Sequence, residues 1–397
     1  MKHRAQAAAA AVVLSVAGLV LWRSRGAPTP DAGPTPTPRV VEGPKPLEAP
    51  KPADNGQAAP RVDIVFALDT TSSMSGLIAG AKAKIWEIAR KAQEGKPAPE
   101  LRVGLVAYRD KGDQYVTKVL DLTGDLDKVY ATLTELRAEG GGDLPEHVIK
   151  GLDDATGAVH WTSDERAVKL VYLVGDAPPK SYEDAPSLDE ILARARRRGI
   201  RISAIRCGNN AQTLETWTTI AQRTDGEVST IEQSGGVVAV ATPFDAELAR
   251  LNAELAATEV HWGSEGERRS AREDLHRNLA GSAAEQADRA SFFGAIGSSA
   301  KARKKDLAAS PTATAELAKV RDEDLPDELR SMSPEERGRF VEAKRARREA
   351  VLQEVRALSQ KREDHLRAAA PSPAPTSFDG RVYDSLRKAG AKAGIAY

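Results

Sequence analysis

Cysteine and large aromatic residues are scarce in this sequence, and neither charge is in excess. Cys207 has no second thiol in the chain to pair with, so stability has to come from packing or from a bound metal. Aromatic residues make up 5% of the 397 residues, which leaves few large side chains for packing outside one main core. Lys plus Arg and Asp plus Glu number 57 each, a balance that gives no reason to expect nucleic acid as a partner.

The common catalytic motifs are also missing. The sequence contains no Gly-x-x-x-x-Gly-Lys-Ser/Thr phosphate loop, no His-Glu-x-x-His pair and no Gly-x-Ser-x-Gly nucleophile turn. His147 stands beside Glu146, but such a pair is more often part of a helix surface than an acid–base couple. We therefore expect a protein that is not an enzyme.

The first 26 residues resemble an export signal. After a basic start, residues 5–22 form an apolar run that only Gln6 and Ser15 interrupt. As a helix this run spans about 27 Å, close to the hydrocarbon thickness of a membrane. An uncleaved signal-anchor with its N-terminus in the cytoplasm is the first expectation, and a signal peptide cleaved after Ala17 is the alternative.

Residues 27–60 have a different composition, dominated by Pro, Ala, Thr and Gly. Proline removes backbone donors and fixes φ, so this segment is expected to be an extended linker rather than a folded domain.

Short apolar runs alternate with amphipathic stretches between residues 61 and 240. The pattern predicts strands at 62–68, 103–108, 116–122, 168–174, 200–206 and 227–231. It predicts helices at about 74–88, 125–138, 145–158, 187–198 and 211–224. Alternation of this kind implies a doubly wound α/β domain, in which helices flank a mainly parallel sheet in a Rossmann-like arrangement.

Oxygen-bearing side chains stand where three of these predicted strands or turns end. They are Asp69, Thr71 and Ser73 in the first loop, Asp143 after a glycine turn, and Asp176 after the strand at 168–174. Each residue alone fits an ordinary helix cap or turn. Because ligands bind at the carboxyl ends of parallel strands, their joint occurrence predicts a divalent-cation site, most simply for Mg²⁺, with Mn²⁺ or Ca²⁺ as alternatives.

The first loop resembles a known motif. Asp69-x-Thr71-x-Ser73 is similar to the metal-ion-dependent adhesion site (MIDAS) of von Willebrand factor A (VWA) domains, Asp-x-Ser/Thr-x-Ser. The runs 106–110, 141–146 and 175–179 resemble one branch of that family, which includes bacterial and hemicentin-like domains. The resemblance implies a VWA domain over residues 61–240 that binds a protein ligand.

The resemblance also implies the roles of individual residues. Asp69, Thr71 and Ser73 would be direct cation ligands, and Asp176 would reach the cation through water. Asp143 stands where many adhesion domains have a threonine, so a third carboxylate would bind the cation more tightly and make it less electrophilic. Arg109, Asp110 and Glu146 lie near the same strand ends and are candidates for ligand binding. For Arg109, pairing with a nearby acidic group is the alternative.

Residues 241–370 are predicted to be helical and highly charged. Phe244, Leu248, Leu251 and Leu255 have the spacing of a packed helix. A capping box at Ser333 begins a second helix, which runs to about residue 366 with an apolar stripe of Val351, Val355 and Leu358. These coiled-coil-like helices offer a surface for oligomerisation, and residues 371–397 are expected to be a weakly ordered tail.

These observations lead to one functional expectation and one alternative. The first is an extracytoplasmic binding protein of a bacterial cell envelope. Its VWA domain binds a protein through the cation, and residues 5–22 anchor it in the cytoplasmic membrane unless cleavage releases it. The alternative is an assembly component of an envelope complex, in which the C-terminal helices make the contacts and the metal only stabilises the fold.

Overall fold

The computed structural model describes residues 59–142, 146–233, 241–297, 305–310, 312–369 and 377–397. The expected export signal, most of the expected linker and Asp143 lie outside these residues. Of the helices in the described ranges, none is both long and apolar enough to cross a membrane.

The described residues form a six-stranded sheet, as the sequence predicts. Its strands are β1 (Arg61–Asp69), β2 (Glu100–Tyr108), β3 (Thr117–Thr123), β4 (Val168–Gly175), β5 (Ile200–Cys207) and β6 (Val228–Ile231). They lie in the order β3-β2-β1-β4-β5-β6, and only β3 runs antiparallel to its neighbour. β1 and β4 are central and buried along almost their whole length, which explains their continuous apolar runs.

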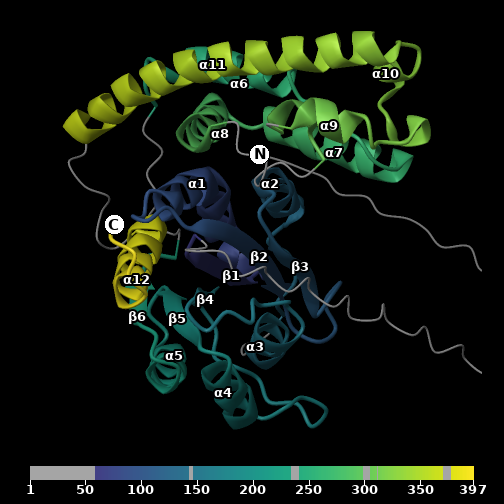
Figure 1. The fold of residues 1–397 in the computed structure, drawn as a ribbon. Coiled ribbons are helices and arrows are strands. Elements are labelled where there is room, and N and C mark those ends of the chain that lie inside the picture. The colour runs from purple at the N-terminus through teal and green to yellow at the C-terminus, as the bar shows by residue number, and fades with distance from the viewer. Residues whose placement is uncertain (1–58, 143–145, 234–240, 298–304, 311, 370–376) are drawn as a thin grey trace, which may run out of the picture. The chain divides into compact units, whose positions relative to one another are not determined.

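Helices cover both faces of the sheet, which confirms the doubly wound α/β fold (Figure 1). One face packs against α3 (Val148–Gly157), α4 (Leu188–Arg197) and α5 (Ala211–Arg223). The other packs against α1 (Ser75–Gln93) and α2 (Leu126–Glu135). Side chains of β1 alternate between the two cores: Val65 and Ala67 enter the first, whereas Ile64, Phe66 and Leu68 enter the second.

The helix predicted to begin at residue 145 begins only at Val148. The reason is that Glu146 makes backbone bonds to the segment after β4. Its amide donates to Pro178 O at 3.1 Å, and its carbonyl accepts from Lys180 N at 2.7 Å. An extended bridge therefore replaces the first helical turn and holds Glu146 at the sheet edge.

The charged C-terminal region is helical, as predicted, and packs on the second face of the sheet domain. It contains α6 (Asp245–Ala256), α7 (Glu265–Leu279), α8 (Ala283–Ile296), α9 (Ala313–Leu317), α10 (Asp327–Arg330) and α11 (Pro334–Ala369). α6, α8 and α11 pack on one another, and α8 also lies against α1 (Figure 1). The predicted stripe residues Leu251 and Val351 are buried here, so the region folds back onto the domain rather than projecting as an arm.

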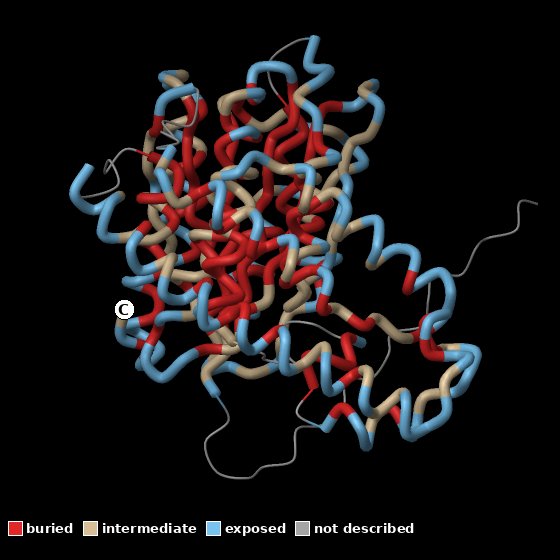
Figure 2. Tube along the Cα trace, turned by 90° about the horizontal axis from the view of Figure 1, so that it is seen from above, coloured by how far each residue is buried: buried red, intermediate tan, exposed pale blue. Residues whose placement is uncertain are grey.

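An aromatic cluster joins the helical region to the sheet domain. Trp86 of α1 lies 5.5 Å from Phe292 and 5.9 Å from Phe293 of α8, measured between ring centroids. Buried residues gather along the strands and the inner sides of the helices (Figure 2). The two regions thus share one core.

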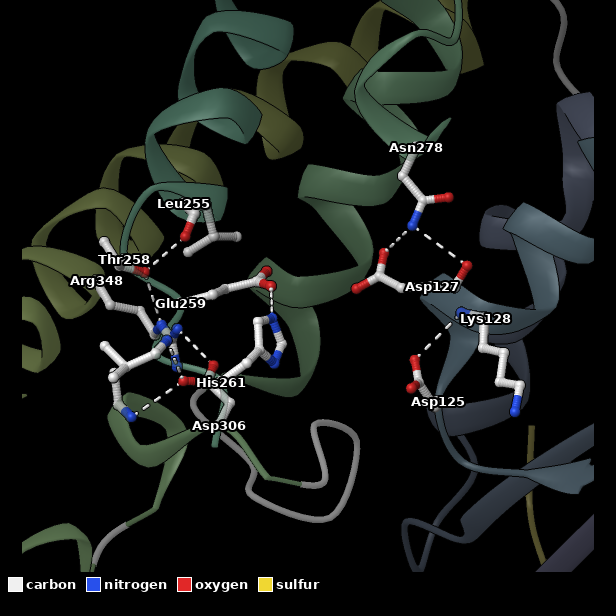
Figure 3. A network of polar contacts seen from close by, with 12 residues as sticks. Asp125, Asp127, Lys128, Leu255, Thr258, Glu259, His261, Asn278, Asp306 and Arg348 are labelled. Carbon is white, nitrogen blue, oxygen red and sulfur yellow. Dashed lines mark hydrogen bonds and ion pairs between the residues drawn. The ribbon is translucent and has the colours of Figure 1, made fainter. Parts of the chain in front are cut away.

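Figure 3 shows polar contacts within the helical region and between its helix α7 and α2. Asn278 of α7 donates to the carboxylate of Asp127 on α2 at 2.7 Å. The guanidinium of Arg289 is completely buried and pairs with the same carboxylate at 2.5 Å. It also contacts Glu259 at 3.2 Å. Buried charge is therefore compensated across the contact between the helical region and α2.

The expectation of a weakly ordered tail is wrong for the last described segment. Residues 378–392 form α12 (Phe378–Lys392), whose Phe378, Val382 and Leu386 are buried in the main core. The hydroxyl of Tyr172 on β4 donates to Val382 O at 3.0 Å. The hydroxyls of Ser385 on this helix and Ser203 on β5 lie 3.0 Å apart, so α12 packs directly on the sheet.

α12 belongs to the sheet domain, although it comes last in the sequence. It covers the β4 and β5 side of the sheet next to α1, although about 150 residues separate it from β6 in the sequence. The end of the segment is also fixed. Ala396 exchanges backbone bonds with Lys96 at 2.8 and 3.0 Å, and the Tyr397 hydroxyl donates to Ala92 O. Helices α6–α11 thus form an insertion between β6 and the helix that completes the sheet domain.

Candidate functional site

The first loop of the predicted site directly follows β1. Asp69 is completely buried, and its Oδ1 accepts bonds from the Thr71 amide at 2.9 Å and the Thr71 hydroxyl at 2.6 Å. Its Oδ2 is also buried and has no hydrogen-bond partner among the described residues. Oδ1 of Asp69 thus holds the loop in place, and Oδ2 is available to bind a cation.

Alternate residues of this loop point in different directions. The Ser73 hydroxyl lies 3.4 Å from that of Thr71, on the same side as Asp69. The Ser72 hydroxyl points elsewhere and donates to Gly140 O at 2.8 Å. The structure therefore brings Asp69, Thr71 and Ser73 together in the alternating order that the sequence predicts.

Asp176 follows β4, the neighbour of β1 in the sheet. Its Oδ1 is buried without a partner in the described part of the chain, while its Oδ2 accepts a bond from Gln233 at 2.6 Å. The preceding Gly175 allows the two loops to approach. A Cβ at Gly175 would lie 2.9 Å from Asp69 Cβ and 2.6 Å from the Tyr108 hydroxyl, distances too short for any side chain.

Glu146 adds a third carboxylate at this edge of the sheet. Only 2% of the residue is exposed, and within the described ranges its Oε2 has no partner. Gly141 separates it from the first loop, because a Cβ there would lie 3.0 Å from Thr71 Cβ and 3.2 Å from Glu146 Oε1. The φ of +74° at Gly141 also requires glycine. Asp143, two residues further on, lies outside the described residues.

The electrostatics of the site reflect buried negative charge. Burial, reinforced by the charge of Asp176, raises the pKa of Asp69 to about 7, although bonds from Thr71 act in the opposite direction. Burial and the charge of Asp69 raise the pKa of Glu146 to about 8. Carboxylates with raised pKa values next to one another form a place where positive charge is favoured.

The donor set fits a hard divalent cation. Asp69 Oδ2 and Asp176 Oδ1 supply two carboxylate oxygens, and Thr71 and Ser73 supply two hydroxyls. Mg²⁺ accepts such oxygen ligands and keeps several waters. Among the described residues, no group of three or more His, Cys, Asp or Glu side chains is placed so that it could hold a metal. A cation held by Asp69 and Asp176 would add the Thr71 and Ser73 hydroxyls to these two carboxylates.

Arg109 and Asp110 have internal partners. Arg109 is buried and donates to the carbonyl oxygens of Thr70 at 3.1 Å and Arg137 at 2.7 Å. Asp110 pairs with Lys180 at 2.7 Å and accepts a bond from the Tyr182 hydroxyl. Both side chains hold loops in position around the site. Of the three residues predicted to bind the ligand, Glu146 has a buried oxygen without such a partner in the described chain.

Gln233 was missed in the sequence analysis, and Gly175 was included in the run 175–179 without being given a role. Gln233 contacts Asp176, and Gly175 makes room for Asp69. Gln233 follows the predicted strand at 227–231, so the rule that ligands bind at strand ends would have pointed to it. A glutamine in a polar loop has no motif of its own, and its contact with Asp176 depends on the sheet order.

The fold and the site together define an α/β domain with an oxygen-rich site at the carboxyl edge of its sheet. Residues 63–242 match the family model of the von Willebrand factor A domain. This part of the chain is therefore a VWA domain, which confirms the expectation from the sequence motifs. The match ends before the helical region and α12.

Similar proteins match only part of the chain. Von Willebrand factor A domain-containing protein 7 of Rattus norvegicus is 32% identical over 144 residues, which are 36% of this chain and 15% of that protein. Among solved structures, the SpRpn10 VWA domain matches with a TM-score of 0.33 and 16% identity over 44% of this chain and 89% of that one. The pilus adhesin SpaC of Lactobacillus rhamnosus GG, in an open conformation, matches with a TM-score of 0.34 and 15% identity over 44% of this chain and 28% of that one.

Proposed function

We propose that this protein is a non-catalytic binding protein whose VWA domain uses one divalent cation, most simply Mg²⁺, to bind a protein ligand. The main support is a set of three buried carboxylate oxygens, each without a partner among the described residues. They are Asp69 Oδ2, Glu146 Oε2 and Asp176 Oδ1. A buried, unpaired carboxylate costs free energy, and a cation at this place would compensate that cost.

Each residue has a defined role in this proposal. Asp69, Thr71 and Ser73 hold the cation directly, and Asp176 holds it directly or through water. Glu146 contributes negative charge behind the first loop, and Asp143 remains a candidate sixth residue of the site. When bound, the cation supplies an open position for an oxygen of the ligand, such as a carboxylate.

The place of action belongs to the same proposal. The apolar run at 5–22 supports a tether in the cytoplasmic membrane of a bacterial cell envelope, with the VWA domain outside. Determining the N-terminus of the protein purified from its native membrane tests this. Residues 1–17 are expected to be retained, and a mature chain that begins after Ala17 would instead identify a cleaved, periplasmic or secreted protein.

Ligand binding is tested by capture from the native envelope in Mg²⁺ or in EDTA, followed by measurement of the affinity of the captured protein. Ser73→Ala removes one proposed ligand, whereas Ser72→Ala removes a neighbouring hydroxyl that points away from the site. We expect binding to Ser72→Ala as to wild type, and loss of binding in EDTA or with Ser73→Ala. Binding that persists in EDTA and maps to residues 245–397 would support the assembly role and reject the proposal.

A further inference from the structure

Gln233, the second residue after β6, lies between the two loops of the proposed cation site. Its side-chain amide donates to Asp176 Oδ2 at 2.6 Å and to the main-chain oxygen of Ser73 at 3.2 Å. Both partners are acceptors, so the NH₂ group rather than the carbonyl of the amide has to face them. One side chain thus connects the loop after β4 with the loop after β1.

The neighbouring strand leaves space for this side chain. Gly208 follows β5 and has a φ of +72°. A Cβ at Gly208 would lie 2.4 Å from Gln233 Oε1, so a larger residue there would displace the amide. The exposed side chain of Gln233 thus lies against residues that follow three strands, β1, β4 and β5.

Because of this contact, the two carboxylate oxygens of Asp176 have different surroundings. Oδ2 is held by Gln233, whereas the buried Oδ1 has no partner within the described residues. A neutral amide fixes the carboxylate without cancelling its charge. A lysine in the same place would supply the positive charge itself and would compete with a cation.

We propose that Gln233 is a positioning residue of the cation site, which holds Asp176 so that Oδ1 is directed to the cation. This inference rests on the proposed function, since it requires that the site binds a cation. Residues that orient a metal ligand without touching the metal typically change affinity by about 10–100-fold when they are removed.

The test is calorimetric titration of the whole protein with Mg²⁺. Gln233→Ala is expected to lower the affinity about 10-fold or more, and Gln233→Lys is expected to lower it further because the ammonium group occupies the place of positive charge. Gln353→Ala changes an exposed glutamine on α11 and is expected to bind as wild type does.

Thermal unfolding separates positioning from a purely structural role. Gln233→Ala is expected to melt as wild type does in EDTA, and to gain less melting temperature than wild type when Mg²⁺ is added. If Gln233→Ala lowered the melting temperature equally with and without Mg²⁺, or if both Gln233 variants bound Mg²⁺ with unchanged affinity, the inference would be overturned and the cation site would remain. Failure of the wild-type protein itself to bind Mg²⁺ would overturn the proposed function.

Discussion

Asp69 combines complete burial with two bonds to Oδ1 and none to Oδ2 among the described residues. This asymmetry indicates what the residue does. Thr71 uses one oxygen to fix the loop after β1, and the second oxygen is left for a cation. Asp176 repeats the pattern, and Glu146 also has one buried oxygen that is unpaired in the described chain. Each of these three carboxylates, from separate loops, would therefore be stabilised by a positive charge at this edge of the sheet.

Protonation and cation binding are expected to compete at these carboxylates. Without a cation, the pKa of Asp69 is about 7 and that of Glu146 about 8. In the unfolded chain both ionise near their ordinary values, roughly 4. Between about pH 4 and pH 8 the folded state therefore holds more protons than the unfolded state, and their contribution to stability falls as pH rises.

Mg²⁺ binds the ionised carboxylates, so its stabilising effect is expected to increase as pH rises. The rise in melting temperature that roughly 10 mM Mg²⁺ produces should be larger at about pH 8 than at about pH 5.5. Scanning calorimetry of wild type and Ser73→Ala, each with Mg²⁺ and with EDTA, measures it. A Mg²⁺ effect that is the same at both pH values would contradict the assignment of these carboxylates to the site.

α12 shows how a single element can complete a domain from a distance. It supplies Phe378, whose ring lies 6.0 Å from that of Phe66 on β1, and it accepts a bond from the Tyr172 hydroxyl through Val382 O. Because these contacts lie in the main core, the sheet domain depends on residues far beyond the end of its family match at 242.

Truncation of the Phe378 side chain is expected to destabilise the protein by roughly 3–5 kcal/mol, the usual effect of removing a buried phenylalanine. Denaturant unfolding measures the change. Arg387→Ala, on the exposed side of the same helix, is the matched control and is expected to change stability by less than about 0.5 kcal/mol. Equal effects of the two substitutions would mean that α12 is not packed as described.

The sequence predicts the strands of the sheet, but it does not predict α12. Buried strands such as β1 and β4 are readable because uninterrupted apolar runs end in polar loops, and those ends contain Asp69 and Asp176. The apolar residues Phe378, Val382 and Leu386 of α12 recur every four residues, but the sequence does not show which strands they pack on, since partners such as Tyr172 are 210 residues away. The contact of Gln233 with Asp176 likewise depends on the final order of the strands.

The helical region and the sheet domain behave as one unit because they share a core and a buried ion pair. Arg289 of α8 is 0% exposed and contacts Asp127 of α2 and Glu259 after α6. A third contact, to Asn252 Oδ1 at 2.7 Å, links it to α6. Such an arrangement holds the insertion against the domain and does not suit an independently moving arm.

Arg289→Ala is expected to destabilise the whole molecule by about 3–5 kcal/mol, because it removes the buried guanidinium that pairs with Asp127 and Glu259. Arg347→Ala removes an exposed pair with Glu254 and is expected to cost at most about 1 kcal/mol. Denaturant titration followed by tryptophan fluorescence and by circular dichroism compares the two variants. If Arg289→Ala were as mild as Arg347→Ala, the helical region would not be attached through this pair.

The central claim is that the edge of the sheet binds one divalent cation, and electron paramagnetic resonance with Mn²⁺ tests it most directly. Titration of the whole protein with Mn²⁺ measures how much of the free-ion signal disappears. Wild type and Ser72→Ala are expected to bind a single Mn²⁺ that Mg²⁺ displaces, whereas Ser73→Ala binds it more weakly and Asp69→Ala does not bind it. Binding of Mn²⁺ by Asp69→Ala as by wild type, or no binding by wild type, would contradict the account.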